Sequence, residues 1–401
     1  MKVLVLSAQF PHPPRSGFET RVCQLIRQLA EHHQVTLMSF CEPGQDGSPV
    51  AEQGWSQVHV RTITYRSQSG PSKRAGQLLT IASTKPYACR DVYSREMQEA
   101  ITELCTKEDF DVVQLESSLF CQYSYPAHVK LLLDEHNIEY ELLTRMARSE
   151  RSLTRRLFNR IEADRFRRFE RRAWDSVDGS LVCSERESEI LRTYAPRTPV
   201  VVAPNGVDLD YFRPSSAAPE PLTAVFNGVL DYRPNFDAAL YLVDEIWPQV
   251  LSARPEARLA IVGRARDADI NALRRPSVDI TGEVADIRPH LQRAAVVLAP
   301  LRMGGGTRLK IVEGLALGKA IVSTHVGCEG IAVRDREHLL IADDADAIAA
   351  AVLELFDDQS LAQRLGRRGR ELVEAQYSWN VAGQRLHTLL ATMVDSDREF
   401  V

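Results

Sequence analysis

Three consecutive glycines, Gly304 to Gly306, separate a strongly apolar segment from a segment with helical spacing. Thr307 is a good N-cap for a helix over 308–317, which Gly318 would end. The bare amides of such a turn can approach an anion closely, and the positive end of the helix dipole strengthens the attraction. The sequence therefore predicts a seat for a phosphate group at the start of this helix.

Two charged side chains of the same predicted helix extend this chemistry. Lys310 lies in the first turn, where its ammonium would add positive charge beside a phosphate. Glu313 follows Gly306 by two helical turns, about 10 Å along the axis, and so lies on the same face. A carboxylate at that distance suits a ribose diol, so the spacing suits a nucleoside diphosphate. The competing interpretation is a glycine turn that only permits tight packing, with Glu313 in solvent.

A second dense polar group, Asp134-Glu135-His136-Asn137, follows a nearly all-apolar segment. His136 is the candidate functional side chain in this group. The competing interpretation is a helix start that Asp134 or Asn137 caps. Gln114 and Glu116 end another predicted strand, and for them a structural role is favoured over a role at an acceptor.

The elements that must position these groups alternate between strands and helices, which is typical of parallel sheets covered by helices. In the first half we expect a helix at 17–30 and strands at 2–6, 35–40, 111–116, 129–134, 181–184 and 200–203. In the second half we expect helices near 237–253, 286–294 and 307–317, and strands at 224–227, 258–263, 278–281, 296–299 and 320–323. The fold class predicted is α/β, with two Rossmann-like doubly wound domains.

A stretch at 213–221 is rich in Pro, Ser and Ala and has no periodicity, which predicts a linker. The first domain then spans 1–212 and the second spans 222–376. We expect the last helix, within 377–401, to cross back to the first domain. Ligands of open α/β sheets bind outside the carboxyl ends of the strands, so we expect a site in a cleft across which the two domains face.

The composition is that of a globular protein, and a net charge of −5 over 401 residues gives no indication of nucleic-acid binding. The seven cysteines are scattered without a C-x-x-C pair, which argues against structural zinc and fits a reducing, cytoplasmic environment. The apolar run at the N-terminus is too short for a signal peptide, and no run of 18 apolar residues is present. We expect neither a bound metal nor a cofactor.

Charge is concentrated in one segment, 148–172, which carries ten arginines and a net charge of +6 against −11 for the rest of the chain. Together with its leucines and phenylalanines, this composition is compatible with a basic amphipathic helix that contacts anionic lipid at the membrane surface. The commoner interpretation is a solvated helix face on which arginines lie beside Glu162 and Glu170.

Several passages together resemble the family-four glycosyltransferases, a large group of retaining enzymes with the two-Rossmann (GT-B) fold. The passages are Pro300–Thr324, Ser184-Glu185 with Pro204-Asn205-Gly206-Val207-Asp208, Phe226-Asn227-Gly228 with Arg258–Gly263, and Thr281-Gly282-Glu283-Val284. The resemblance covers nearly the whole chain and is closest after residue 180. It implies transfer of a sugar from a nucleoside diphosphate sugar, without a cofactor, to a hydroxyl group of a carbohydrate, lipid-linked or small-molecule acceptor.

The resemblance also implies roles for individual residues. It places Glu313 at the donor ribose, Gly17 beneath the diphosphate and His136 at the acceptor side. The other donor-binding candidates are Gly228, Gly282, Val284, Gly304, Gly305, Gly306, Thr307 and Arg308. Lys310 and Arg233 join His136 as catalytic candidates, because a diphosphate leaving group needs cationic charge.

The sequence departs from the family pattern at two places, which concern the contacts to the donor sugar and the cationic charge at the diphosphate. Gly305 stands where the family often has a glutamate. Val229 follows Gly228 where the family tends to have arginine, and Pro234 and Asn235 occupy the region of a usual lysine.

Three alternative hypotheses remain open. A nucleotide-sugar epimerase would need catalytic carboxylates in the cleft, and a phosphorylase usually needs a cofactor lysine; the sequence shows neither clearly. A non-catalytic sugar-nucleotide-binding subunit is the third, and Gly305 favours it. The nucleotide base, the sugar and the acceptor are not specified by the sequence.

Overall fold

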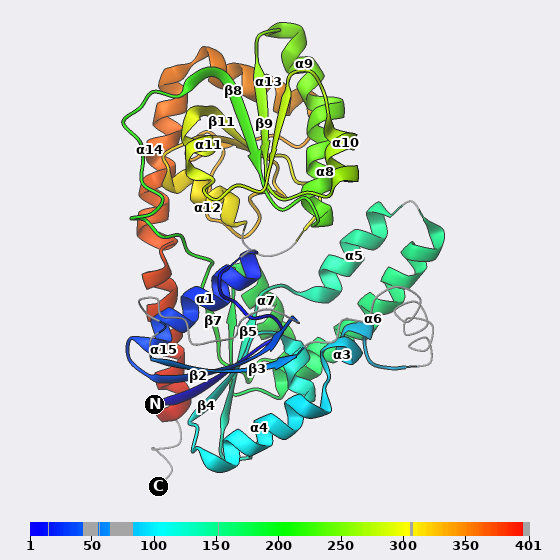
Figure 1. The fold of residues 1–401 in the computed structure, drawn as a ribbon, viewed down its shortest axis with the longest axis vertical. Helices are drawn as coiled ribbons and strands as arrows, with labels where there is room; N and C mark the ends of the chain where they lie inside the picture. The colour runs from blue at the N-terminus through cyan, green and yellow to red at the C-terminus, as the bar shows by residue number, and fades with distance from the viewer. Residues whose placement is uncertain are drawn as a thin grey trace. The chain divides into compact units, whose positions relative to one another are not determined.

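The computed structural model describes residues 1–14, 16–42, 55, 57–64, 83–150, 152–304 and 308–395. The chain forms two compact units: unit 1 comprises Met1–Pro204 and Trp379–Val401, and unit 2 comprises Asn205–Ser378. Each unit is an α/β domain built on one sheet (Figure 1). The predicted pair of doubly wound domains, with a last helix that returns to the first, is confirmed.

Unit 1 contains a seven-stranded sheet in the order β3-β2-β1-β4-β5-β6-β7. The strands are β1 (Lys2–Ser7), β2 (Gln34–Cys41), β3 (Val58–Thr64), β4 (Val112–Leu115), β5 (Lys130–Glu135), β6 (Gly179–Val182) and β7 (Val200–Val202). All neighbouring strands run parallel. The strand order reverses between β1 and β4, and ligands of such sheets bind at the carboxyl ends beside this reversal.

The helices of unit 1 are α1 (Gly17–Ala30), α3 (Tyr87–Val92), α4 (Arg95–Lys107), α5 (Glu139–Ser149), α6 (Leu153–Asp175), α7 (Glu185–Tyr194) and α15 (Trp379–Asp395), with a 3-10 turn η2 at Ser118–Gln122. Helix α1 has the predicted bounds. Ser16 caps it, since its hydroxyl accepts a hydrogen bond from the Glu19 amide at 3.2 Å. The buried face of α1 carries the expected apolar residues and also one charged residue, Arg21.

Unit 2 contains a six-stranded sheet in the order β10-β9-β8-β11-β12-β13, again with parallel neighbours. The strands are β8 (Glu220–Asn227), β9 (Arg258–Val262), β10 (Val278–Gly282), β11 (Ala294–Ala299), β12 (Ala320–Ser323) and β13 (Leu340–Ile341). The order reverses between β8 and β11, so the carboxyl ends of these two strands mark the expected ligand position.

The helices of unit 2 are α8 (Arg233–Tyr241), α9 (Trp247–Ala253), α10 (Asp267–Leu273), α11 (Arg288–Arg293), α12 (Leu309–Ala316), α13 (Ala345–Asp357) and α14 (Gln359–Gln376). A π-helical turn, η3 (Leu242–Ile246), joins α8 to α9. The predicted helix at 237–253 therefore begins earlier, at Arg233, because Pro234 occupies a position in the first turn where its missing amide costs nothing.

The boundary between the units lies at Pro204/Asn205, ahead of the predicted first-domain end at residue 212. The reason is local hydrogen bonding within unit 2. The Val207 amide donates to the Tyr377 carbonyl at 2.8 Å, and Arg370 Nη1 donates to the Phe212 carbonyl at 2.7 Å. The predicted linker at 213–221 also overlaps the start of β8.

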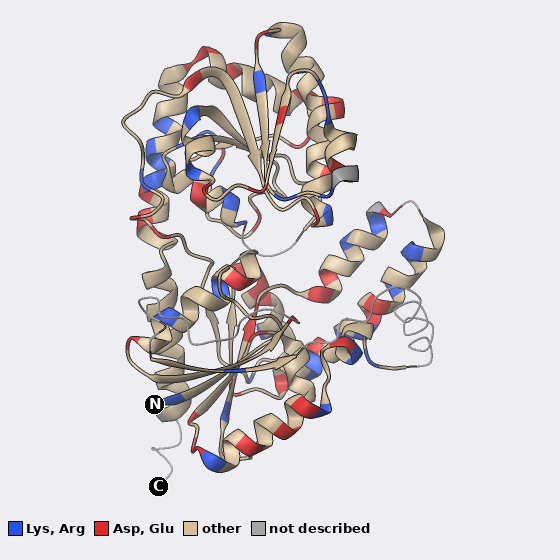
Figure 2. Cartoon of the chain, in the orientation of Figure 1, with Lys and Arg blue, Asp and Glu red and all other residues tan. Residues whose placement is uncertain are grey.

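The Arg-rich segment is divided between two helices, α5 and α6, which form a hairpin with basic residues on both arms (Figure 2). The interpretation of Glu162 and Glu170 as solvated is wrong, because both are buried. Glu162 accepts a hydrogen bond from the Tyr87 amide at 2.7 Å and pairs with Arg165. Among the described residues, no helix has both the length and the apolar character to cross a bilayer.

Candidate active site

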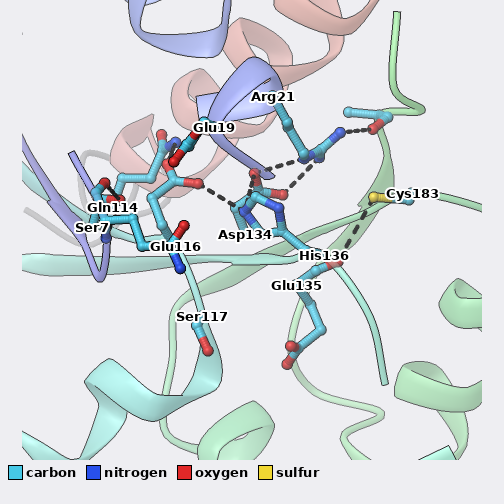
Figure 3. Close-up of polar contacts among 12 residues, drawn as sticks. Ser7, Glu19, Arg21, Gln114, Glu116, Ser117, Asp134, Glu135, His136 and Cys183 are labelled. Atoms are coloured by element: carbon cyan, nitrogen blue, oxygen red, sulfur yellow. Dashed lines mark hydrogen bonds and ion pairs between the residues drawn. The ribbon is translucent and has the colours of Figure 1, made fainter. Parts of the chain in front are cut away.

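The carboxyl ends of β4 and β5 in unit 1 bring together Glu116, Asp134 and His136 (Figure 3). His136 Nε2 lies 2.9 Å from Glu116 Oε2 and 3.5 Å from Asp134 Oδ2. One ligand atom from each residue lies within 4.8 Å of the others, a spacing that would suit a metal ion. The sequence singled out His136 but no such cluster, since Glu116 belongs to a different strand.

A positive charge already occupies this cluster. The Arg21 guanidinium donates two hydrogen bonds to Asp134, at 2.8 Å and 2.6 Å, and a third to the Ala203 carbonyl at 2.8 Å (Figure 3). Arg21 and Asp134 are both fully buried. Burial opposes both charges, yet Asp134 raises the pKa of Arg21, and Arg21 holds the pKa of Asp134 below its ordinary value. Asp134 is therefore neutralised within the protein.

Glu116 and His136 remain as the pair that can exchange a proton. Burial raises the pKa of Glu116, although the hydrogen bond with His136 opposes the shift. Gln114 Nε2 donates to the other carboxylate oxygen of Glu116 at 2.6 Å. The His136 ring lies against Phe18 of α1, with the ring centroids 4.6 Å apart and the ring planes tilted by 32°. The His136 side chain is 12% exposed. The imidazole is thus held on two sides and accessible on a third.

Strand β5 sends its polar side chains to opposite faces of the sheet. Asp134 and His136 lie on one face, and Glu135 points away from them (Figure 3). Glu135 accepts a hydrogen bond from Trp174 Nε1 at 2.9 Å, and burial together with Glu170 raises the pKa of Glu135 strongly. Glu135 is therefore part of the interior of unit 1 and not of the cluster.

The interpretation of this loop as a helix start capped by Asp134 or Asn137 is wrong. Helix α5 begins at Glu139, and its N-cap position is Ile138, which offers no capping side chain. The carboxylate of Glu170 from α6 accepts the Glu139 and Tyr140 amides instead, at 2.7 Å and 3.1 Å. A partner from another helix satisfies these amides, and a local pattern could not predict it.

The sequence analysis did not identify Arg21 as a residue of this cluster, although its position on α1 indicated that it is buried. It lies on the same helical face as Val22, Leu25, Ile26 and Leu29, which are all buried. A charged residue on the apolar face of an amphipathic helix needs a buried partner. Gly17, a donor-binding candidate, is the first residue of α1 and is exposed.

In unit 2, three glycines stand at the carboxyl ends of adjacent strands: Gly228 after β8, Gly263 after β9 and Gly282 at the end of β10. Gly228 and Gly263 have φ of 155° and 147°, values that disfavour a side chain. A Cβ on Gly263 would lie 2.0 Å from the Gly228 carbonyl oxygen, while one on Gly282 would meet no described atom within 4 Å. At the carboxyl ends of these three strands the backbone is therefore not covered by side chains of the glycine positions.

Lys310 of α12 reaches the same edge. Its Nζ donates to Asn235 Oδ1 at 2.9 Å and lies 4.2 Å from the centroid of the Phe226 ring. A Cβ on Gly228 would lie 2.9 Å from this ammonium, so the absence of a side chain at Gly228 provides the space for Lys310. Burial, with Arg308 nearby, lowers the pKa of Lys310 to about 7.

Glu313 lies on α12 one turn after the helix begins at Leu309 and is half-buried. Burial raises the pKa of Glu313 to about 7, against the attraction of Lys310. The helix begins at Leu309, so Glu313 is about 6 Å from its first residue along the axis. The predicted separation from Gly306 is not tested, because Gly306 lies outside the described residues. The N-cap position is Arg308, not Thr307, and no side chain caps it.

The remaining candidates differ in position. Gly304 has a φ of 133°, and a Cβ there would lie 2.7 Å from the Arg308 guanidinium, which therefore covers it. Arg233 is exposed at the start of α8, two residues before Asn235, and Val284 is half-buried just after β10. Gly305, Gly306 and Thr307 lie outside the described residues.

Models of two protein families match the chain. The one described as Glycosyltransferase Family 4 matches residues 15–211, and the one described as Glycosyl transferases group 1 matches residues 221–358. The chain belongs to the family-four glycosyltransferases. In this member, the Lys310 side chain lies beside Gly228.

Curated relatives are similar over part of their length. A GDP-mannose-dependent monoacylated alpha-(1-6)-phosphatidylinositol monomannoside mannosyltransferase of Corynebacterium glutamicum is 29% identical over 210 residues, 47% of this chain and 55% of the relative. A phosphatidyl-myo-inositol mannosyltransferase of Mycolicibacterium smegmatis is 28% identical over 207 residues, 48% of this chain and 52% of the relative. The match thus spans little more than half the length of these relatives.

Solved structures share the fold at low identity. Sucrose-phosphate synthase from Thermosynechococcus elongatus aligns with a TM-score of 0.74 and 18% identity, over 99% of this chain and 100% of that one. Anabaena HepE in complex with UDP-glucose aligns with a TM-score of 0.67 and 14% identity, over 98% and 100%. WaaG, a glycosyltransferase involved in lipopolysaccharide biosynthesis, aligns with a TM-score of 0.65 and 14% identity, over 98% of each chain. These matches show the GT-B fold of the family.

Proposed function

We propose that this protein moves a sugar from a nucleoside diphosphate sugar to a hydroxyl acceptor with retention of anomeric configuration. The observation that carries the proposal is the arrangement at the strand-order reversal of unit 2. Lys310 Nζ lies beside Gly228, and Glu313 lies one turn further along α12. At this separation the cation suits the diphosphate of a donor and the carboxylate suits its ribose diol. The glycines at the strand ends leave the backbone accessible beside them.

The donor half of the reaction belongs to unit 2. The diphosphate binds at the N-terminus of α12, where the helix dipole and the Lys310 ammonium attract its charge. Glu313 accepts hydrogen bonds from the ribose hydroxyls and so fixes the nucleoside. We assign Gly304 and Arg308 to the donor sugar, and Gly228, Gly282 and Val284 to the border of the nucleotide.

The chemical step exchanges one bond at the anomeric carbon for another. The bond between this carbon and the diphosphate oxygen breaks, and a bond to the acceptor oxygen forms on the same face of the sugar. The leaving diphosphate takes the proton of the acceptor hydroxyl. Lys310 stabilises the charge that develops on the leaving group, and fixed charge of this kind is commonly the largest contribution to catalysis. Exposed Arg233 is the second candidate cation.

Unit 1 supplies the acceptor side. His136 presents an accessible imidazole whose orientation Glu116 and Phe18 fix. We assign it to a hydrogen bond with a hydroxyl group at the reacting centre.

The hairpin of α5 and α6 supports a lipid-linked acceptor. Leu153, Leu157 and Ile161 follow one another at intervals of four residues on α6, with 76%, 60% and 38% of their surface exposed. Exposed Arg160 follows Leu157 by three residues and so lies on the same helical face as this apolar row. An apolar row with a basic neighbour suits the surface of an anionic membrane. We therefore propose peripheral membrane contact through α6.

The names of the curated relatives give this proposal a first donor to test, GDP-mannose, and a first acceptor class, glycolipids. The test is incubation of the purified protein with GDP-mannose, UDP-glucose and other nucleotide sugars, with octyl glycosides and lipid extracts as acceptors. Transfer that depends on the acceptor, with the donor's anomeric configuration kept by NMR, is the expected result. Turnover of a donor to an epimer without acceptor would support the epimerase hypothesis instead.

A further inference from the structure

Two loops of unit 2 are joined at the carboxyl ends of β8 and β9. The Leu230 amide, in the loop after β8, donates to the Arg264 carbonyl, in the loop after β9, at 2.8 Å. The Nε atom of Arg264 also lies 3.2 Å from Asp231 Oδ2, and the Arg264 side chain is 45% exposed. The guanidinium of Arg264 is therefore anchored on its Nε side, at the row of strand ends where ligands of such sheets bind.

The terminal amino groups of Arg264 are available for a ligand. Its Nη1 and Nη2 make no hydrogen bond with any residue that the structure describes. Arg266, in the same loop, differs, because its Nε and Nη2 donate to the two carboxylate oxygens of Asp269 at 2.7 Å and 3.3 Å. Arg264 thus presents an unused fork of two donors, whereas the fork of Arg266 is occupied.

The base of a nucleotide has more room on the β9 and β10 side of the sheet than on the other side. A Cβ on Gly282, at the end of β10, would meet no described atom within 4 Å. On the other side, His325 follows β12 and Asp343 follows β13. Their side chains are 73% and 57% exposed, and His325 Nδ1 lies 2.6 Å from Asp343 Oδ2. A base that extends from the strand-order reversal toward β10 passes Arg264.

We propose that Arg264 recognises the base of the donor and that this base is guanine. The inference rests on the proposed function, because it requires a nucleotide at this edge of the sheet. Guanine carries two neighbouring acceptors, O6 and N7, and one guanidinium can donate to both. Adenine presents an amino group beside N7, and thymine and uracil present the single acceptor O4. The fork of Arg264 therefore makes two hydrogen bonds with guanine and at most one with the other bases.

Asp231 is a positioning residue for this recognition. Its carboxylate lies between two guanidinium groups, since Arg266 Nε is 3.7 Å from Asp231 Oδ1 on the side opposite to the contact with Arg264. A fixed carboxylate restricts the conformations of the long Arg264 side chain. Less conformational freedom is then lost when the base binds, which favours binding.

The test is isothermal titration of the full chain with GDP, UDP and ADP, which share the ribose and the diphosphate and differ in the base. We expect GDP to bind about tenfold or more tightly than UDP and ADP, since one bidentate pair gives discrimination of this size. Arg264→Ala should weaken GDP binding by about tenfold and leave UDP binding unchanged, so that the preference disappears. Arg266→Ala is the matched control and should keep the preference, because its fork is held by Asp269.

Two analogues of GDP identify the atoms that Arg264 binds. 7-Deaza-GDP lacks N7 and should bind more weakly than GDP to the natural sequence, but as GDP does to Arg264→Ala. IDP keeps O6 and N7 and lacks the amino group at C2, so it should bind as GDP does. A loss of affinity with IDP, together with no loss with 7-deaza-GDP, would assign the preference to the other edge of guanine and contradict the role of Arg264.

The remaining outcomes separate base recognition from the proposed sugar transfer. Equal losses of GDP, UDP and ADP affinity in Arg264→Ala would make Arg264 a phosphate contact and overturn the inference. A natural sequence that binds UDP or ADP as tightly as GDP would also overturn it, and in both cases the proposed sugar transfer would stand. Absence of binding by every nucleoside diphosphate would contradict the proposed function as well. Arg264→Ala should keep the Tm of the natural sequence, because exposed ion pairs contribute little to stability.

Discussion

Glu116 Oε2 and His136 Nε2 lie 2.9 Å apart at the carboxyl ends of neighbouring strands β4 and β5. Arg21 already neutralises the third member of the cluster, Asp134. Glu116 is therefore the hydrogen-bond partner that orients the His136 imidazole, which makes Glu116 a positioning residue for the proposed acceptor side.

Glu116→Gln tests this relationship. The amide keeps the shape of the side chain but removes its charge, so His136 loses its ionic partner. We expect the rate of sugar transfer to fall by about 10²-fold or more, with a shifted pH profile, while donor affinity stays the same. Stability should not fall, because burial raises the pKa of Glu116 and an ionised carboxylate is costly there. Glu99→Gln on exposed α4 is the control, and an equal loss of rate there would contradict the assignment.

Arg21→Met tests the buried ion pair. The substitution leaves Asp134 charged and unpaired in the interior, which should lower the free energy of unfolding by about 3–5 kcal/mol. The double variant Arg21→Met/Asp134→Leu should recover part of this loss, because no isolated charge remains. Denaturant unfolding measures both. Arg95→Met breaks an exposed pair with Glu99 and should cost less than about 1 kcal/mol; similar losses at Arg21 and Arg95 would show that burial is not the cause.

Donor binding should take up protons above pH 7 and release protons below pH 7. The pKa of Lys310 is lowered to about 7, so at pH 8 the free amine is mostly neutral. A bound diphosphate favours the ammonium, and binding therefore takes up protons. The pKa of Glu313 is raised to about 7, so at pH 6 the free carboxyl is mostly protonated. Ribose hydroxyls favour the carboxylate, and binding there releases protons.

Calorimetric titration with the donor in buffers of different ionisation enthalpy measures the number of protons taken up or released on binding. Lys310→Ala should abolish uptake at pH 8, and Glu313→Gln should abolish release at pH 6. Proton linkage that persists in both variants would mean that other groups titrate with the donor.

Membrane contact through α6 is tested with lipid vesicles. The protein should sediment with vesicles that contain anionic lipid and stay free of zwitterionic vesicles, and salt should weaken the association. Leu153→Ser/Leu157→Ser should abolish sedimentation. Tyr93→Ser removes another exposed apolar side chain of unit 1 and should have no effect. Sedimentation of the double Ser variant equal to that of the natural sequence would exclude α6 as the contact.

Local patterns in the sequence predicted the architecture well. The apolar spacing of α1 and the buried strands β5 and β11 determined the order of the elements, because their periods are set by burial on one or both faces. The charges on α12 were predictable too, since a helix fixes the spacing of Lys310 and Glu313. The helix start was misplaced by one residue, since its N-cap position is Arg308 and not Thr307.

The cluster in unit 1 could not be predicted in the same way. Arg21 and Asp134 are 113 residues apart, and only the fold brings them together. The break between α5 and α6 was missed because Ser149 to Ser152 contains neither glycine nor proline. Glu162 and Glu170 looked solvated because their partners, the amides of Tyr87 and Glu139, belong to other elements.

The measurement that tests the central claim most directly is nucleotide binding by unit 2. Titration of the full chain with GDP, UDP, ADP and dTDP should identify at least one ligand that binds without added metal. Glu313→Ala/Lys310→Ala should weaken that ligand by about 100-fold or more, since two hydrogen bonds to charged groups are lost. Glu256→Ala/Arg274→Ala, a matched pair on the surface of unit 2, should bind as the natural sequence does. Nucleotide affinity that survives in the α12 double variant would contradict the proposed donor site.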